Sequence, residues 1–464
     1  MKKQRRPTSQ LLFAAVIFIL IFTMSPVDAS FKTRQKQDNT NPCTSSMVKD
    51  ILPGSGSANI RLATPFGNKL FFFVNDGTHG YEPWVSDGTE AGTYQIAEIN
   101  PNGDALGDGS YAKPIVFEGS IYFSAKDETN LHYLWKTNGT KDHAVKVDPQ
   151  ALKADSLTTL DDELFIFSGS STWTLWKTNG DGLTKVRDFT NDSRGSSAAT
   201  ANGWLFFFTY GNGLGGTKLW KTNGTETEIV RAFPALSHYV PGILIAANNL
   251  VFFAPIEEPY GIELWQSDGT TTQLVQDLNL NGGTLFTDPV VISDTLYYFG
   301  DDGVQGVLYR TRGKSTGIEK VFDRSMMWMK NIGGKLYFDM KIDGKKPLSR
   351  MAVSSFGEPG TVQTLTSASG DYTVGDAVAW YRGWVFFSAT DANHGQELWV
   401  TDGTPEGTHI CVDIQTGIES SSPTSFFVLN GKMLFIADDG MHGAELWSLQ
   451  TNGLSNVFLP ITYK

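Results

Sequence analysis

Residues 397–404 read Glu-Leu-Trp-Val-Thr-Asp-Gly-Thr, and residues 263–270 repeat this order as Glu-Leu-Trp-Gln-Ser-Asp-Gly-Thr. Seven Trp residues share this Leu-Trp or Pro-Trp context: Trp84, Trp135, Trp176, Trp220, Trp265, Trp399 and Trp447. Leu308-Tyr309 and Leu348-Ser349 are expected to fill the gap before Trp399. Counted through Tyr309 and Leu348, the positions are 51, 41, 44, 45, 44, 39, 51 and 48 residues apart. We therefore predict nine repeats, and a period of this size is typical of propeller blades.

Each repeat has the same internal order of apolar stretches and turns. Asn248-Asn249, Gly333-Gly334 and Asn430-Gly431 accept the positive φ of two-residue hairpins. Aromatic stretches such as residues 205–208 follow such turns, and no stretch shows a sustained 3.6-residue apolar period. The sequence predicts an all-β fold, a β-propeller of about nine four-stranded blades. Eight blades are the alternative, because the sixth and seventh repeats are degenerate.

The Trp of each repeat has two interpretations. Large aromatic side chains fill the space between packed sheets, which favours a core role for all seven Trp residues. The alternative is a sugar-stacking surface formed by exposed rings.

The two ends of the chain are expected to meet. Residues 47–51 resemble the last strand of a repeat, as in residues 411–414, although they precede the first repeat. A propeller completes its last blade with such a strand. Cys43 precedes this strand and Cys411 lies in the last strand of the eighth repeat, so we predict a Cys43–Cys411 disulfide.

The first 29 residues read as a signal peptide. Four Lys and Arg residues precede an apolar run over residues 11–24, and Val27-Asp28-Ala29 offers a cleavage site. We divide the chain into a signal peptide (1–29), a polar segment (30–46) and one propeller domain (47–464). The expected product is secreted and extracellular, with no membrane span after cleavage. The formal net charge of −12 gives no basic footprint for nucleic acid.

The two quoted octapeptides are similar to the ELWxxDGT repeat, found in large exported proteins of bacteria and some eukaryotes. The resemblance covers residues 47–464. It is strong in repeats one, five and eight, and it is also good in repeat nine. In repeats two to four Asn138, Asn179 and Asn223 replace the Asp, and repeats six and seven fit poorly. The resemblance implies an exported, propeller-like protein and assigns no reaction.

The polar residues of the repeat are weighed as structural first. Asp87, Asp268 and Asp402 stand at equivalent turns, where an Asp side chain bonds the backbone of its own turn. A calcium or acid-base role is the alternative. His79, His394 and His442 each precede a Gly and then a Glu, so they are the candidate metal ligands, against a hydrogen-bonding role. We expect no metal and no cofactor.

Function is predicted at the level of class. Asn138, Asn191 and Asn223 are glycosylation acceptors if the chain passes through a eukaryotic secretory route. No nucleophile, phosphate-loop or zinc motif is present in the sequence, so an enzyme is disfavoured. The favoured function is a binding or scaffold protein for an extracellular glycan or protein. A glycan-processing hydrolase or lyase and a structural matrix or coat component are the alternatives.

Overall fold

The computed structural model describes residues 43–106, 112–169, 172–190, 192–211, 216–234, 242–280, 282–284, 286–301, 306–322, 326–341, 349–355, 363–365, 373–391 and 393–451. The chain divides into Met1–Thr40 and a compact unit, Asn41–Lys464. The predicted signal peptide (1–29), most of the polar segment (30–42) and Asn191 lie outside the described residues.

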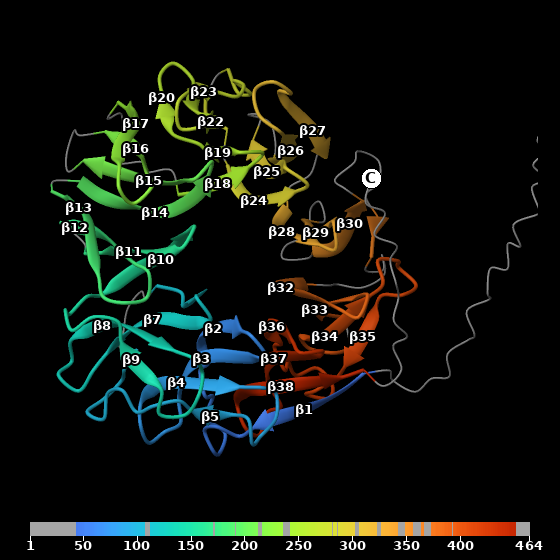
Figure 1. Ribbon diagram of the computed structural model, residues 1–464. Helices are drawn as coiled ribbons and strands as arrows, with labels where there is room; N and C mark the ends of the chain where they lie inside the picture. The colour runs from blue at the N-terminus through green and yellow to red at the C-terminus, as the bar shows by residue number, and fades with distance from the viewer. Residues whose placement is uncertain are drawn as a thin grey trace, which may run out of the picture. The chain divides into compact units, whose positions relative to one another are not determined.

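The described part of the compact unit is an all-β propeller of nine four-stranded antiparallel sheets. In blades one to eight the strands follow chain order from the centre of the ring to its rim, and in blade nine the order is β36, β37, β38 and then β1 (Figure 1). Blades one to three are β2 (Arg61–Phe66), β3 (Lys69–Asn75), β4 (Tyr81–Ser86) and β5 (Tyr94–Gln95); β6 (Ile115–Phe117), β7 (Ser120–Lys126), β8 (His132–Thr137) and β9 (Ala144–Lys146); and β10 (Ala154–Leu160), β11 (Glu163–Ser168), β12 (Trp173–Thr178) and β13 (Thr184–Phe189). Blades four to six are β14 (Asp192–Ala201), β15 (Trp204–Gly211), β16 (Thr217–Thr222) and β17 (Thr227–Phe233); β18 (Leu244–Ala247), β19 (Leu250–Phe253), β22 (Trp265–Ser267) and β23 (Thr272–Leu274); and β24 (Thr287–Ile292), β25 (Thr295–Asp301), β26 (Gly306–Thr311) and β27 (Ile318–Phe322). Blades seven to nine are β28 (Met326–Ile332), β29 (Lys335–Lys341), β30 (Ser349–Ser355) and β31 (Gln363–Thr364); β32 (Thr373–Tyr381), β33 (Trp384–Thr390), β34 (Glu397–Thr401) and β35 (His409–Val412); and β36 (Thr424–Leu429), β37 (Lys432–Asp438), β38 (Ala444–Gln450) and β1 (Thr44–Lys49). A short ribbon, β20 (Ile256–Glu257) with β21 (Gly261–Ile262), extends blade five.

The connections of each blade fall at two opposite ends, because its strands are antiparallel. The turn end carries the hairpin between the first two strands and the turn between the last two. The linker end carries the loop between the second and third strands and the link to the next blade. The predicted hairpins form at the turn end: Asn248 and Asn249 have φ of 52° and 58°, and Asn430 and Gly431 have φ of 46° and 73°.

The ring closes inside blade nine. The N-terminal strand β1 pairs antiparallel with β38, which confirms the predicted closing strand. The predicted disulfide is also confirmed, with the Cα atoms of Cys43 and Cys411 5.4 Å apart across 368 residues of sequence. Because Cys411 belongs to β35, the bridge ties the outermost strand of blade nine to that of blade eight.

A cluster of buried apolar side chains fills every junction between neighbouring blades, including the junction of blades nine and one. Phe72 and Trp84 of blade one, for example, pack with Leu434 and Leu446 of blade nine. Burial of this apolar surface is the main favourable term for holding the blades together.

The seventh repeat corrects one sequence assignment. In the other blades the Trp or Tyr of the third strand pairs with an aromatic or aliphatic residue of the second strand, as in Phe207↔Trp220 and Tyr298↔Tyr309. In blade seven the residue opposite Phe338 is Ala352, so the expected position at Leu348-Ser349 was wrong. The spacings become 352 − 309 = 43 and 399 − 352 = 47, closer to the other repeats.

Candidate functional site

The acidic residues of the repeat turns are bound within their own turns. Asp87 Oδ1 accepts the backbone N–H of Thr89 at 2.9 Å and its hydroxyl at 2.6 Å, and Asp402 holds Thr404 in the same way. Asp268 Oδ1 accepts two backbone N–H groups, from Thr270 and Thr271, which lower the pKa of Asp268. Asn138 and Asn223 accept the same bonds without a charge.

A second residue of these turns was missed from the sequence. The hydroxyl of the residue two before the turn Gly accepts the N–H of that Gly, as Thr222 Oγ1 does for Gly224 at 3.0 Å. The same bond recurs in seven blades, from Ser86, Thr137, Thr178, Thr222, Ser267, Thr311 and Thr401. The recurrence of Ser or Thr at this one position was the available signal.

The Glu of the repeat holds the link to the next blade. Glu82 is fully buried, and its two carboxylate oxygens accept the backbone N–H groups of Ile99 and Asn100. Glu445 does the same for Ile51 and Leu52. Burial raises the pKa of Glu82 and of Glu445 to about 7, although the backbone donors favour the ionised form.

Each candidate metal-ligand His is bound to an Asp of its own loop instead of to the Glu. His79 Nδ1 lies 2.7 Å from Asp76 Oδ2, and the corresponding distances are 2.9 Å for His394 to Asp391 and 2.8 Å for His442 to Asp439. The hydrogen bond with Asp76 raises the pKa of His79, and the one with Asp439 raises the pKa of His442. Among the described residues, no group of three or more His, Cys, Asp or Glu side chains is placed to hold a metal ion.

The motif Trp residues lie between blades. Six are buried, with exposures of 4–9%, and Trp176 is half-buried. Each packs on the preceding blade, as Trp220 does against Phe167 and Phe207 at the junction of blades three and four. The glycosylation candidates Asn138 and Asn223 are exposed at the tips of their turns.

The repeat therefore uses its own polar and aromatic residues to build the ring, and a ligand site is expected where the repeat departs from its pattern. Blades six and seven depart most. In blade seven Ala352 occupies the third-strand position that holds Trp or Tyr in the other blades. In blade six the sequence reads Arg310-Thr311-Arg312-Gly313 where blades two to four read Lys-Thr-Asn-Gly. Arg312 thus replaces the Asp or Asn of the turn.

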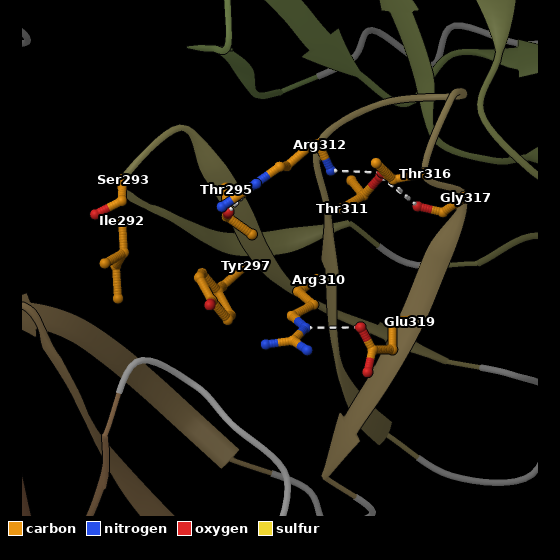
Figure 2. Close-up of a pocket in the computed structure, with 10 residues that line it drawn as sticks. All are labelled: Ile292, Ser293, Thr295, Tyr297, Arg310, Thr311, Arg312, Thr316, Gly317 and Glu319. Atoms are coloured by element: carbon orange, nitrogen blue, oxygen red, sulfur yellow. Dashed lines mark hydrogen bonds and ion pairs between the residues drawn. The ribbon is translucent and has the colours of Figure 1, made fainter. Parts of the chain in front are cut away.

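A cavity of about 390 Å³ opens at this place, at the turn end of blade six (Figure 2). Its lining combines hydroxyl groups, two guanidinium groups, one phenol and one carboxylate with apolar surface: Ile292, Ser293, Thr295, Tyr297, Arg310, Thr311, Arg312, Thr316, Gly317 and Glu319. A volume of this size is in the range of small-molecule sites. We call this cavity the blade-six pocket.

Two rows of side chains shape the blade-six pocket. Tyr297, Arg310 and Glu319 stand opposite one another on neighbouring strands, and Arg310 Nε donates to Glu319 Oε2 at 2.9 Å. Arg312 Nε donates to Thr295 Oγ1 at 2.8 Å. Figure 2 shows Arg310 and Glu319 along one side and Arg312 reaching back toward Thr295 along the other.

At other junctions the turn of the following blade occupies the corresponding place. Lys69 of blade one donates to Gly139 O of blade two at 2.7 Å, and Lys136 of blade two donates to Gly180 O of blade three at 2.7 Å. Lys221 of blade four reaches Gly269 O of blade five at 2.9 Å. Arg310 has the strand position of Lys136 and Lys221. Residues 356–362 of blade seven lie outside the described residues.

Within the described ranges, no helix is long and apolar enough to cross a membrane. No known protein-family model matches the chain, and no curated protein matches it. Similar solved structures include puromycin hydrolase, with a TM-score of 0.41, 10% identity and coverage of 84% of this chain and 60% of that chain. The chain therefore spans about 60% of the length of that enzyme. A prolyl endopeptidase gives a TM-score of 0.40 and 11% identity, with coverage of 71% and 54%. An oligogalacturonate lyase from Vibrio parahaemolyticus gives 0.40 and 12%, with coverage of 90% and 94%.

Proposed function

We propose that this chain is a secreted β-propeller protein that binds an extracellular glycan in the blade-six pocket. The observation that carries the proposal is the coincidence of the pocket with the break in the repeat: a cavity of about 390 Å³ lies in blade six, where Arg312 replaces the turn acid. Elsewhere the same residue positions build the ring.

The lining supports a saccharide as the ligand. Ser293, Thr295 and Thr316 offer hydroxyl groups, and Tyr297, whose side chain is buried, lines the wall. Sugars bind through hydrogen bonds to their hydroxyl groups, so these polar side chains suit them.

The cysteine pair supports export. A disulfide persists in oxidising compartments, and Cys43–Cys411 is present in the folded ring. The signal-like residues 1–29 also support a secreted product. The resemblance to ELWxxDGT-repeat proteins, which begins at residue 47, supports it as well.

The test is a glycan array with the purified mature chain, followed by calorimetry on the best ligand. We expect Thr295→Ala to weaken binding at least about tenfold, because the pocket loses a hydroxyl group and the partner of Arg312 Nε. Ser120→Ala is the matched control, since Ser120 has the same hairpin position in blade two: it pairs with Phe117 across the hairpin as Thr295 pairs with Ile292.

Three results would overturn the proposal. One is an array on which no glycan is retained, and another is equal loss of binding in the two variants. The third is release of cleaved sugar by the wild-type chain, which would make the protein the glycan-processing enzyme considered as the alternative.

A further inference from the structure

We infer that the glycan bound in the blade-six pocket is acidic, a saccharide that carries a carboxylate or sulfate group. The inference rests on the proposed function and specifies its ligand. It is carried by Arg312, which puts a positive charge where six other described turns have Asp or Asn: Asp87, Asn138, Asn179, Asn223, Asp268 and Asp402.

The turn of blade six keeps its shape without the Asp or Asn. Thr311 Oγ1 accepts the N–H of Gly313 at 2.9 Å, as in the other blades. Thr316 Oγ1 accepts the N–H of Arg312 at 3.1 Å, and Gly313 O accepts the N–H of Gly317. These hydrogen bonds pair the backbone groups of the turn without the side chain of Arg312. The turn therefore does not need that side chain for its conformation.

The guanidinium group of Arg312 is held in position at the pocket. Its Nε donates to Thr295 Oγ1 at 2.8 Å, and Thr295 is nearly buried. Among the described residues Arg312 forms no ion pair, since the carboxylate of Glu319 is bound to Arg310 instead. A guanidinium group offers a planar set of N–H donors that matches a carboxylate or sulfate.

The charge of the pocket is opposite to that of the protein. Arg310 and Arg312 both line the cavity with Glu319 as the lining carboxylate, whereas the whole chain carries a formal charge of −12. An acidic saccharide is therefore attracted to this pocket and repelled by most other surfaces of the ring. Attraction at the pocket together with repulsion elsewhere directs an acidic saccharide to the blade-six pocket.

The repeat itself supplies the variant that tests the inference. Arg312→Asn gives blade six the turn residue of blades two to four, so we expect the melting temperature to change by less than about 2 °C. Arg312→Asn combined with Asn223→Arg is the control for net charge, because it moves the cation to an equivalent turn in blade four. Arg312→Lys keeps the charge and removes the planar fork.

Binding is measured by calorimetry with three probes: a hexuronate-bearing tetrasaccharide, a sulfated galactose tetrasaccharide and a neutral galactose tetrasaccharide. We expect wild type to prefer at least one acidic probe by tenfold or more, and the preferred acidic probe identifies the anion. Arg312→Asn and the double variant should both lose most of this preference, and Arg312→Lys should lose part of it. Raised salt should weaken acidic binding in wild type and in Arg312→Lys, which keeps the charge.

The possible failures are distinguishable. If the neutral probe binds as well as the acidic probes and depends on Thr295, the proposed function stands and the acidic ligand is refuted. If Arg312→Asn leaves acidic binding unchanged, the inference also fails. If no saccharide binds, the proposed function fails with it.

Discussion

At the scale of single residues, the Trp positions show how the ring is held together. Each motif Trp is contributed by one blade and packs on the blade before it. The loss of one Trp side chain therefore opens one junction between blades. Other aromatic side chains also fill these junctions. At the junction of blades three and four, Phe189 stacks on Trp173 with 3.9 Å between ring centroids.

We expect Trp220→Ala to lower the free energy of unfolding by about 3–5 kcal/mol, the cost of an aromatic-sized cavity. Trp176→Ala is the matched comparison, because Trp176 has the same repeat position but is half-buried, and it should cost less. Chemical denaturation of both variants measures the difference. Equal losses would contradict the assignment of unequal packing.

The buried Glu residues predict an acid-shifted stability optimum. The pKa of Glu82 and of Glu445 is about 7 in the folded chain against an ordinary 4.5, so the folded form holds more protons between these values. The contribution of these two groups to the free energy of unfolding is therefore greatest below about pH 4.5. It falls as the pH rises to 7, by up to about 3 kcal/mol for each Glu. Asp76 and Asp439 have lowered pKa values and act in the opposite direction at still lower pH.

Glu82→Gln should flatten the dependence of unfolding free energy on pH between 4.5 and 7, whatever its effect on stability at one pH. Glu90→Gln is the control, since Glu90 is exposed on the adjacent turn. Denaturation curves at four or five pH values decide the matter. A slope unchanged in Glu82→Gln would show that burial does not shift this carboxyl.

At the scale of elements, the turn between the third and fourth strands depends on its first hydroxyl. Thr222 Oγ1 accepts the N–H of Gly224 and donates to Glu226 O, and Thr222 is fully buried. Thr222→Val removes both bonds at constant shape and should cost about 1–3 kcal/mol. Thr225→Val is the control, because Thr225 contributes its backbone N–H to Asn223. Comparable losses in the two variants would contradict the role of the hydroxyl.

The sequence predicted these elements because their signals are local. Hairpins at Asn248-Asn249 and Asn430-Gly431 follow from the conformations that Asn and Gly tolerate. The third strand of blade seven was misaligned because Leu348 matches the Leu of the Leu-Trp motif. The register of this strand is set instead by the pairing of Phe338 with Ala352, which the sequence pattern does not reveal. The blade-six pocket was not predicted, since a cavity depends on how side chains from different strands pack. Arg312 at the turn position was the visible signal.

At the scale of the whole molecule, the disulfide joins strands from the two ends of the chain. The Cys43→Ser, Cys411→Ser double variant should lose about 2–5 kcal/mol, because the bridge restricts a very long loop of the unfolded chain. Thermal unfolding of the variant and of the wild type with and without reductant provides the measurement. Reductant should destabilise only the wild type, and a variant as stable as the oxidised wild type would refute the role of the bridge.

The closing strand also imposes an order of events on biosynthesis. β1 precedes every other described strand in the chain, and its partner β38 follows all of them. At about 5–20 residues per second, the 368 residues between Cys43 and Cys411 take roughly 20–70 s to synthesise. Throughout that time the nascent chain carries an unmatched β-strand and a thiol with no partner. Synthesis of β38, rather than collapse of any single blade, is therefore the event that permits the ring to close.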